Sequence, residues 1–280
     1  MVSPATIDSI SQDLLRDSVA LARESDRPLT IHISESVLEF NNMVRREGIT
    51  PVQWASQLGV LGARTILGHA IFIDEHSALN WFSRRDLALI AESAATVAHC
   101  PTPFSRYGQV MEHFGRYVEA GINMGIGTDC LPKNMLEELR TASILSRVAA
   151  ANVHATTLAD VFRAATVGGA DALGRADLGR LTPGAKADLV LVDLEHPHMR
   201  PVRDPLRSLI FSAAERAVKS VYVDGRQLVE NARVLTIDVE DAHRRLQAAQ
   251  DRMIANVPSN DFLARNADDL TPLSLPLTDN

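Results

Sequence analysis

The sequence has few cysteines, no long apolar run and no excess of positive charge. Its two cysteines, Cys100 and Cys130, form neither a disulfide framework nor a CxxC pair for a structural zinc. No apolar run approaches the roughly 18 residues that a membrane span requires, and the opening MVSPATIDSI lacks the features of a signal peptide. A net charge of −7 with interspersed signs argues against nucleic-acid or anionic-membrane binding. We therefore expect a cytoplasmic protein that acts on a small molecule.

The sequence does have enough apolar residues for a sizeable core. Hydrophobic residues make up 46% of its 280 positions, which excludes a chain that is mainly disordered. At roughly 150 residues per domain, the length corresponds to about two domains.

A short β-branched apolar run followed by a polar residue occurs four times. The runs span 28–35, 63–70, 94–101 and 122–129, and each is too short for a helix. Stretches with helical spacing lie between or after them, at 77–92, 108–121, 134–151 and 157–174. This alternation predicts parallel strands joined by crossover helices.

The polar residues that close these runs can bind a metal or move a proton. They are His32, His69, His99 and Asp129, separated by 37, 30 and 30 residues, one strand–helix unit each time. The carboxyl ends of parallel strands carry the chemistry in such folds because the loops there converge on one pocket. A single histidine on an apolar run is more often a core residue, but four coincidences in register favour a site.

Imidazole and carboxylate groups at strand ends predict a site for one divalent metal, with zinc favoured and iron the alternative. We assign His32 and Asp129 as its ligands, and Asp129 would also accept a proton from the activated water. Glu35 would itself take a proton from the metal-bound water and deliver it to a leaving nitrogen, or, as an equal alternative, serve as a carboxylate at a helix start. His69 would polarise the reacting centre or hold the water.

The other histidines and Cys100 have structural interpretations. We expect Cys100 to be packed and His99 either to contact substrate or to be a core residue. His196 and His198 form an HxH pair among prolines, which favours a loop over ligation. Surface positions are expected for the histidines without partners nearby, His76, His113, His154 and His243.

The pattern changes after Gly179. A Pro183-Gly184 turn precedes a strand, and Asp224-Gly225 between two apolar runs predicts a hairpin, so a small antiparallel unit is expected. Helical spacing returns over 238–255, followed by a poorly ordered or surface-draped tail. The resulting domains are 1–175, 176–237 and 238–280.

These motifs resemble those of the amidohydrolase superfamily, in the branch of cytosine and guanine deaminases, S-adenosylhomocysteine deaminases and triazine hydrolases. The resemblance runs from about residue 10 to about residue 235. His32-Ile33-Ser34-Glu35 resembles the His-x-x-Glu that ends the family's fifth barrel strand, and His69 the histidine of the sixth. His99-Cys100-Pro101 and Gly127-Thr128-Asp129 resemble the motifs of the seventh and eighth.

The resemblance implies an α/β fold, the C-terminal half of a (β/α)8 TIM-like barrel (strands five to eight) with a small antiparallel β-sandwich portion. It implies that His32 and Asp129 bind the metal, that Glu35 and His69 serve the reacting centre, and that His99 contacts substrate. The reaction implied is displacement of ammonia or an amine from a ring or amidine-like carbon. The alternatives are amide, carbamate or halide hydrolysis at the same site, or a non-catalytic fragment that pairs with a complementary chain.

The family's first barrel strand ends in His-x-His, which supplies two further ligands, and no such motif precedes His32. Residues 1–28 contain a lead-in and an amphipathic helix over 11–25, capped by Ser9 or Ser11. Four barrel strands alone would leave two unpaired sheet edges. We therefore expect the chain alone to be inactive or weakly active, and to form a homo-oligomer or associate with a missing N-terminal half.

Overall fold

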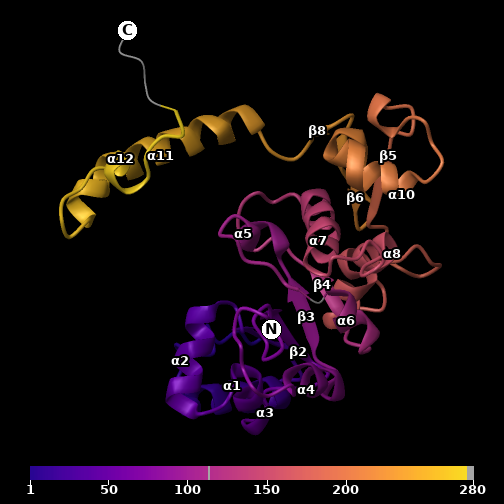
Figure 1. Cartoon of the computed structure of the whole chain (residues 1–280). Coiled ribbons are helices and arrows are strands. Elements are labelled where there is room, and N and C mark those ends of the chain that lie inside the picture. The colour runs from indigo at the N-terminus through magenta and orange to yellow at the C-terminus, as the bar shows by residue number, and fades with distance from the viewer. Residues whose placement is uncertain (113, 276–280) are drawn as a thin grey trace.

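The computed structural model describes residues 1–112 and 114–275, which form two four-stranded sheets with helices around them (Figure 1). The first sheet is parallel, and its strands lie in chain order. This order follows when each strand returns to the sheet through a helical crossover. Its strands are β1 (Leu29–Ile33), β2 (Thr65–His69), β3 (Thr96–His99) and β4 (Met124–Ile126).

The four predicted parallel strands are confirmed, and each is shorter than its apolar run. In β1, Leu29, Ile31 and Ile33 are buried while His32 is exposed, so the two faces of the strand differ. Side chains alternate across a strand, and the buried set therefore faces the helices that cover this side of the sheet.

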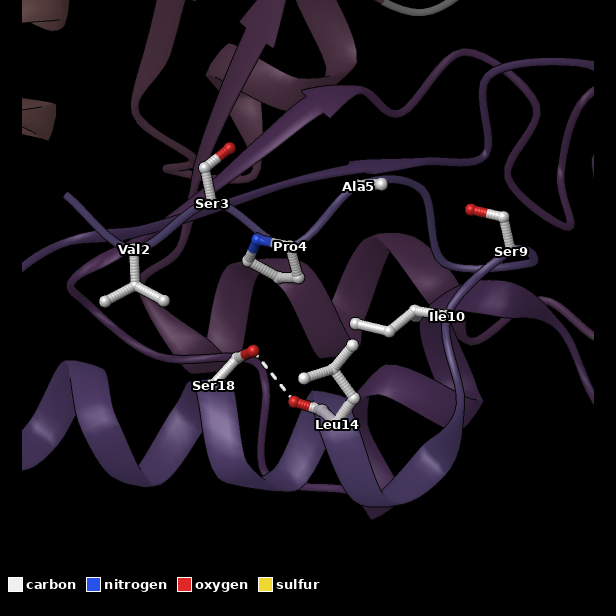
Figure 2. A pocket seen from close by; sticks show the side chains of 8 residues that line it. All are labelled: Val2, Ser3, Pro4, Ala5, Ser9, Ile10, Leu14 and Ser18. Atoms are coloured by element: carbon white, nitrogen blue, oxygen red, sulfur yellow. Dashed lines mark hydrogen bonds between the residues drawn. The ribbon is translucent and has the colours of Figure 1, made fainter.

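The N-terminal segment covers the outer edge of β1. Val2 pairs with Leu29 and Thr6 with His32 in parallel bridges, and the Ile7 amide donates to the His32 carbonyl over 3.1 Å. The expectation of an unpaired edge here is wrong, because the lead-in supplies backbone partners in place of a full strand. A pocket of about 380 Å³ lies against this segment. Figure 2 shows the side chains that line it, which come from this segment and from Ile10, Leu14 and Ser18.

Helices follow each strand of the parallel sheet. The predicted first helix is confirmed as α1 (Gln12–Glu24), and its N-cap is Ser11, whose hydroxyl accepts from the Leu14 amide. The next four are α2 (Val37–Glu47), α3 (Pro51–Gln57), α4 (Asp86–Ser93) and α5 (Pro101–Ser105). The helices that complete this part are α6 (Phe114–Glu119), α7 (Met135–Ala149), α8 (Leu158–Arg163), a π-helical segment (Ala164–Gly168) and α9 (Gly169–Ala172).

Two predicted helices are much shorter than expected: 77–92 is helical only from Asp86, and among the described residues of 108–121 only α6 is helical. In the first case two buried carboxylates hold an irregular loop. The Asp74 carboxylate accepts from the Arg85 amide and the Ser83 hydroxyl, and that of Asp86 accepts from the Asp74 amide and the Thr50 hydroxyl. Side-chain acceptors thus satisfy backbone donors that a helix would otherwise satisfy.

The surface assignment of His76 is wrong. Its side chain is buried against Phe72, its Nε2 lies 3.0 Å from the Val110 carbonyl oxygen, and its Nδ1 accepts from the Ala78 amide. His154 and His243 are exposed as expected, and His113 lies outside the described residues.

The second sheet is antiparallel and contains β5 (Leu189–Val192), β6 (Val218–Val223), β7 (Arg226–Glu230) and β8 (Arg233–Val234). The predicted hairpin is confirmed between β6 and β7, where Asp224 and Gly225 both have positive φ. Between β5 and β6 lie a 3-10 turn (Pro197–Met199), α10 (Pro205–Ser208), a π-helical segment (Leu209–Ala213) and a second 3-10 turn (Ala214–Ala217). His196 caps the first of these turns and His198 lies within it, in agreement with their loop assignment.

Two C-terminal helices follow this sheet. Helix α11 (Val239–Asn260) extends away from the rest of the chain, and none of its residues is buried (Figure 1). It runs past the predicted end at residue 255, and α12 (Ala267–Leu270) follows with a capping box at Asn266, so the expected tail is partly helical. Residues 276–280 lie outside the described part. No described helix combines the length and apolar character needed to cross a membrane.

Gly168 tests the close contact between β4 and the π-helical segment. A Cβ at this position would lie 2.0 Å from the Met124 carbonyl oxygen, so Gly168→Ala must displace backbone. We expect a loss of about 1–3 kcal/mol in the free energy of unfolding, measured by urea denaturation. Gly62→Ala is the control, because its Cβ would meet nothing within 4 Å, and equal losses for both variants would contradict the contact.

Asp86 gives the fold a dependence on pH. Burial and the neighbouring Asp74 raise the pKa of Asp86 from 3.8 to about 7. Because the folded pKa lies above the unfolded one, the contribution of Asp86 to stability is fully present below about pH 4 and is lost as the pH rises through about 7. We expect the stability of the wild type relative to Asp86→Asn to fall from about pH 4 to about pH 8, measured by urea denaturation at each pH.

The comparison with Asp86→Asn cancels an opposite dependence of stability on pH that comes from the buried histidines. Burial lowers the pKa of His69 and His99, so both histidines reduce stability as the pH falls, in wild type and variant alike. A difference that stays flat with pH would contradict the assignment to Asp86.

Candidate functional site

The carboxyl ends of β1 and β2 bring two of the predicted site residues together. Ile33 pairs with His69 in the parallel register, and the His32 and His69 rings stack with centroids 5.1 Å apart and planes inclined by 15°. The His69 ring also lies 4.6 Å from the ring of Phe104, in α5. The imidazoles of two adjacent strands thus share one edge of the sheet, as the spacing of the sequence predicts.

Asp129 joins the same group from beyond the end of β4. It lies three residues after Ile126, outside the strand, with a φ of +50°. Burial and His32 have the larger effects on the pKa of Glu35 and of His69, and the charge of Asp129 also acts on both groups, so all of them lie in electrostatic reach of one another. The structure therefore gathers His32, Glu35, His69 and Asp129, whereas His99 approaches them as a neighbour of His69.

Glu35 lies in the short loop between β1 and α2. Ser36 is the N-cap of α2, and its hydroxyl accepts from the Glu39 amide. Glu35 therefore precedes the helix, and the acidic residue of the first turn is Glu39. The alternative of a carboxylate at the helix start describes Glu39, which leaves Glu35 without that structural role.

Glu39 holds this loop. Its side chain is 4% exposed, and its two carboxylate oxygens accept from the amides of Ser34 and Glu35 over 2.7 and 2.9 Å. Burial raises the pKa of Glu39 to about 7, while these two hydrogen bonds act in the opposite direction. Ser34 adopts the left-handed region with a φ of +52°, so the chain turns sharply where it leaves β1.

The environment holds the two buried histidines neutral. Burial, aided by His32, lowers the pKa of His69 to about 4, and burial with His69 lowers that of His99 to about 3. At neutral pH each ring keeps a lone pair for a metal, a water or a substrate donor. Burial also raises the pKa of Glu35, opposed by nearby His32 and reinforced by Asp129 and Asp8.

Polar atoms without partners concentrate here. In the described residues, five buried side-chain polar atoms have no hydrogen-bond partner, and three belong to residues at or next to the ends of β1, β2 and β3. Leaving such an atom unpaired costs about 1–3 kcal/mol, so each one calls for an explanation such as an absent ligand. The three are Ser34 Oγ, His69 Nδ1 and His99 Nδ1, and the other two, Glu138 Oε1 and Arg140 Nη2, lie in α7.

Cys100 is packed, as predicted. Burial raises the pKa of its thiol to about 12, so no reactive thiolate forms at neutral pH. A Cβ on Gly127 would lie 3.1 Å from its sulfur, which shows how closely the segment before Asp129 passes.

His32 and Asp129, the predicted metal ligands, are both exposed. Within the described residues, no three His, Cys, Asp or Glu side chains stand close enough to enclose a metal ion. The donor chemistry nevertheless fits a divalent metal, since stacked imidazoles, a nearby carboxylate and an unpartnered ring nitrogen are the groups zinc takes.

The model of the amidohydrolase family matches residues 2–228, most of the chain. The chain belongs to the amidohydrolase family. Among curated proteins it is 32% identical over 241 residues to the 5'-deoxyadenosine deaminase of Methanothermobacter thermautotrophicus, covering 85% of this chain and 54% of that protein. It is 33% identical over 251 residues to the 5-methylthioadenosine/S-adenosylhomocysteine deaminase of Halobacterium salinarum, covering 88% and 56%. The chain thus spans about half the length of the curated relatives it matches.

Solved structures are also similar to most of this chain. An adenosine deaminase from Xanthomonas campestris with bound zinc superposes with a TM-score of 0.81 and 27% identity, covering 89% of this chain and 56% of that one. Atrazine chlorohydrolase from Arthrobacter aurescens TC1, complexed with zinc, gives 0.78 and 28%, covering 88% and 53%. The α/β architecture is therefore that of the amidohydrolase family, and these neighbours are consistent with a divalent metal.

Two buried carboxylates of the site were missed by reasoning from the sequence. Ser36-x-x-Glu39 has the spacing of a capping box, which was the available signal for Glu39. Glu138, whose other carboxylate oxygen accepts from the Thr102 amide over 2.9 Å, had no such signal, because its partner lies 36 residues away.

Proposed function

We propose that this chain supplies part of the active site of a metal-dependent amidohydrolase that displaces ammonia from the adenine ring of a 5'-modified adenosine. The observation that carries the proposal is the meeting of His32, Glu35, His69 and Asp129 at one sheet edge, beside buried ring nitrogens without partners. The names of the relatives, deaminases of adenosine derivatives, support this substrate class.

We further propose that β1–β4 correspond to strands five to eight of a (β/α)8 barrel. The parallel order of the sheet and its match to about half of a solved relative support this correspondence. The proposed units are a partial barrel over 1–175, a β-sandwich portion over 176–237 and the C-terminal helices over 238–280.

In this proposal His32 and Asp129 hold a divalent metal, with zinc supported by the neighbouring structures. The metal supplies a water acidic enough to attack at neutral pH. Glu35, whose pKa is raised by burial, would take one proton of the attacking water at its carboxylate and pass it to the leaving nitrogen, which departs as ammonia. His69 would remain a neutral imidazole that orients the water, and Asp129 would accept the second proton as the oxygen becomes the carbonyl of the product. His99 contacts the substrate through its free Nδ1.

We propose that further ligands come from outside these 280 residues. A catalytic zinc takes about three or more protein ligands, and this chain offers two, both on an exposed face. A complementary amidohydrolase half or a second copy of this chain would cover that face. Turnover by this chain alone is accordingly expected to be slow.

Gly68 tests the assignment of His32. Gly68 lies opposite His32 on β2, and a Cβ there would lie 3.0 Å from the His32 Cδ2. Gly68→Ala should shift the imidazole and weaken zinc binding by roughly tenfold, measured by competition with a chelator. Gly125→Ala on β4 is the matched control, because its Cβ would make only ordinary contacts at 3.8 Å or more. Equal affinity in all three proteins would argue against His32 as a ligand.

Glu35 tests the proton-transfer role. Glu35→Gln keeps the shape of the side chain but removes its ability to accept a proton. We expect ammonia release from 5'-deoxyadenosine with added zinc to fall by a factor of about 10²–10⁴, with the zinc content unchanged. Single-turnover assays at high protein concentration give the sensitivity that slow catalysis requires, and equal rates for variant and wild type would refute the role.

A further inference from the structure

The loop that carries Glu35 is tied on both sides by hydrogen bonds. On one side the buried Glu39 carboxylate accepts from the Ser34 and Glu35 amides over 2.7 and 2.9 Å. On the other, the Ser34 carbonyl accepts from the amides of Ile71 and Phe72 over 2.9 and 2.8 Å. The peptide between β1 and Glu35 therefore joins a carboxylate on α2 to the loop that leaves β2.

The same hydrogen bonds reach His69. His69 and Ala70 have positive φ values of +74° and +43°, and they lead directly into Ile71 and Phe72. The Ala70 carbonyl accepts from the buried Tyr117 hydroxyl over 2.7 Å, and the Ala70 amide donates to the Ile33 carbonyl over 3.0 Å. Such strained backbone persists only where surrounding contacts hold it, and these contacts do so.

We propose that Glu39 is a positioning residue that sets the place of Glu35 relative to His69. It touches neither the reacting atoms nor the metal, and it acts through the Ser34–Glu35 backbone. Removing its carboxylate leaves two buried amide donors without acceptors in a strained turn, so the turn loosens and the Ser34 carbonyl loses its fixed position. The proton-transfer role of Glu35 rests on the proposed function, whereas the hydrogen bonds between Glu39 and the Ser34–Glu35 backbone do not depend on it.

The test compares Glu39→Gln with Ser36→Ala. The glutamine side chain has one acceptor oxygen, so at least one of the two amides loses its partner. Ser36→Ala removes the N-cap of the same helix but leaves the Glu39 carboxylate on both amides, so it controls for loosening of α2. Thermal unfolding of both variants identifies any that fail to fold.

The first readout needs no turnover. Hydrogen exchange followed by NMR should be at least about tenfold faster at the Ser34 and Glu35 amides in Glu39→Gln, with a smaller increase at Ile71 and Phe72. Ser36→Ala should leave the Ser34 amide at its wild-type rate. Unchanged exchange in Glu39→Gln, or equal acceleration in both variants, overturns the proposal.

The second readout separates positioning from support of the fold. With 5'-deoxyadenosine and zinc, Glu39→Gln should lower kcat by about tenfold or more at similar KM, whereas Ser36→Ala should keep the wild-type kcat. A wild-type kcat in Glu39→Gln overturns the positioning role. Absence of turnover in the wild type agrees with a chain that holds only part of the metal site, and the exchange rates alone then decide whether Glu39 ties the loop.

Discussion

The parallel register of β1–β4 is the constraint on which the site depends. Because all four strands run in one direction and pair in chain order, their carboxyl ends open on the same edge, about 30 residues apart in sequence and adjacent in space. An antiparallel arrangement of the same strands would send His32 and His69 to opposite edges. Strand direction thus determines which side chains can meet at the site.

Where the strands end at that edge, the backbone turns sharply. Ser34, His69 and Asp129 all have positive φ, which is uncommon for residues with a side chain. These bends turn the chain out of the sheet at the points where the site residues lie. The Glu39 carboxylate accepts from the Ser34 amide, and the Tyr117 hydroxyl donates to the carbonyl of Ala70 next to His69. These hydrogen bonds offset the strain at the first two positions.

Much of this arrangement could be predicted from the sequence, and the failures have a common cause. Runs such as Thr65–His69 contain β-branched residues, which are typical of strands. The intervals between His32, His69 and His99 indicate one strand–helix unit each and so predict the strand order. By contrast, the pairing of Val2 with Leu29 and the hold of Asp86 on the 74–86 loop depend on partners far along the chain. Apolar spacing alone therefore predicted a helix where buried carboxylates hold a loop.

The three histidines of the site and Asp129 differ most in their contact with water. His69 and His99 are 3% and 4% exposed and neutral, whereas His32 and Asp129 face solvent. Charges exert strong forces only where water is excluded, since the same pair interacts several times more weakly at high dielectric. Water is therefore excluded around His69 and His99, whereas solvent screens the electrostatic interactions of His32 and Asp129. If the proposed function holds, the site needs a protein surface over His32 and Asp129 more than it needs another reacting group. The surface that completes the metal site would also exclude water and so strengthen the electrostatic interactions that drive the reaction.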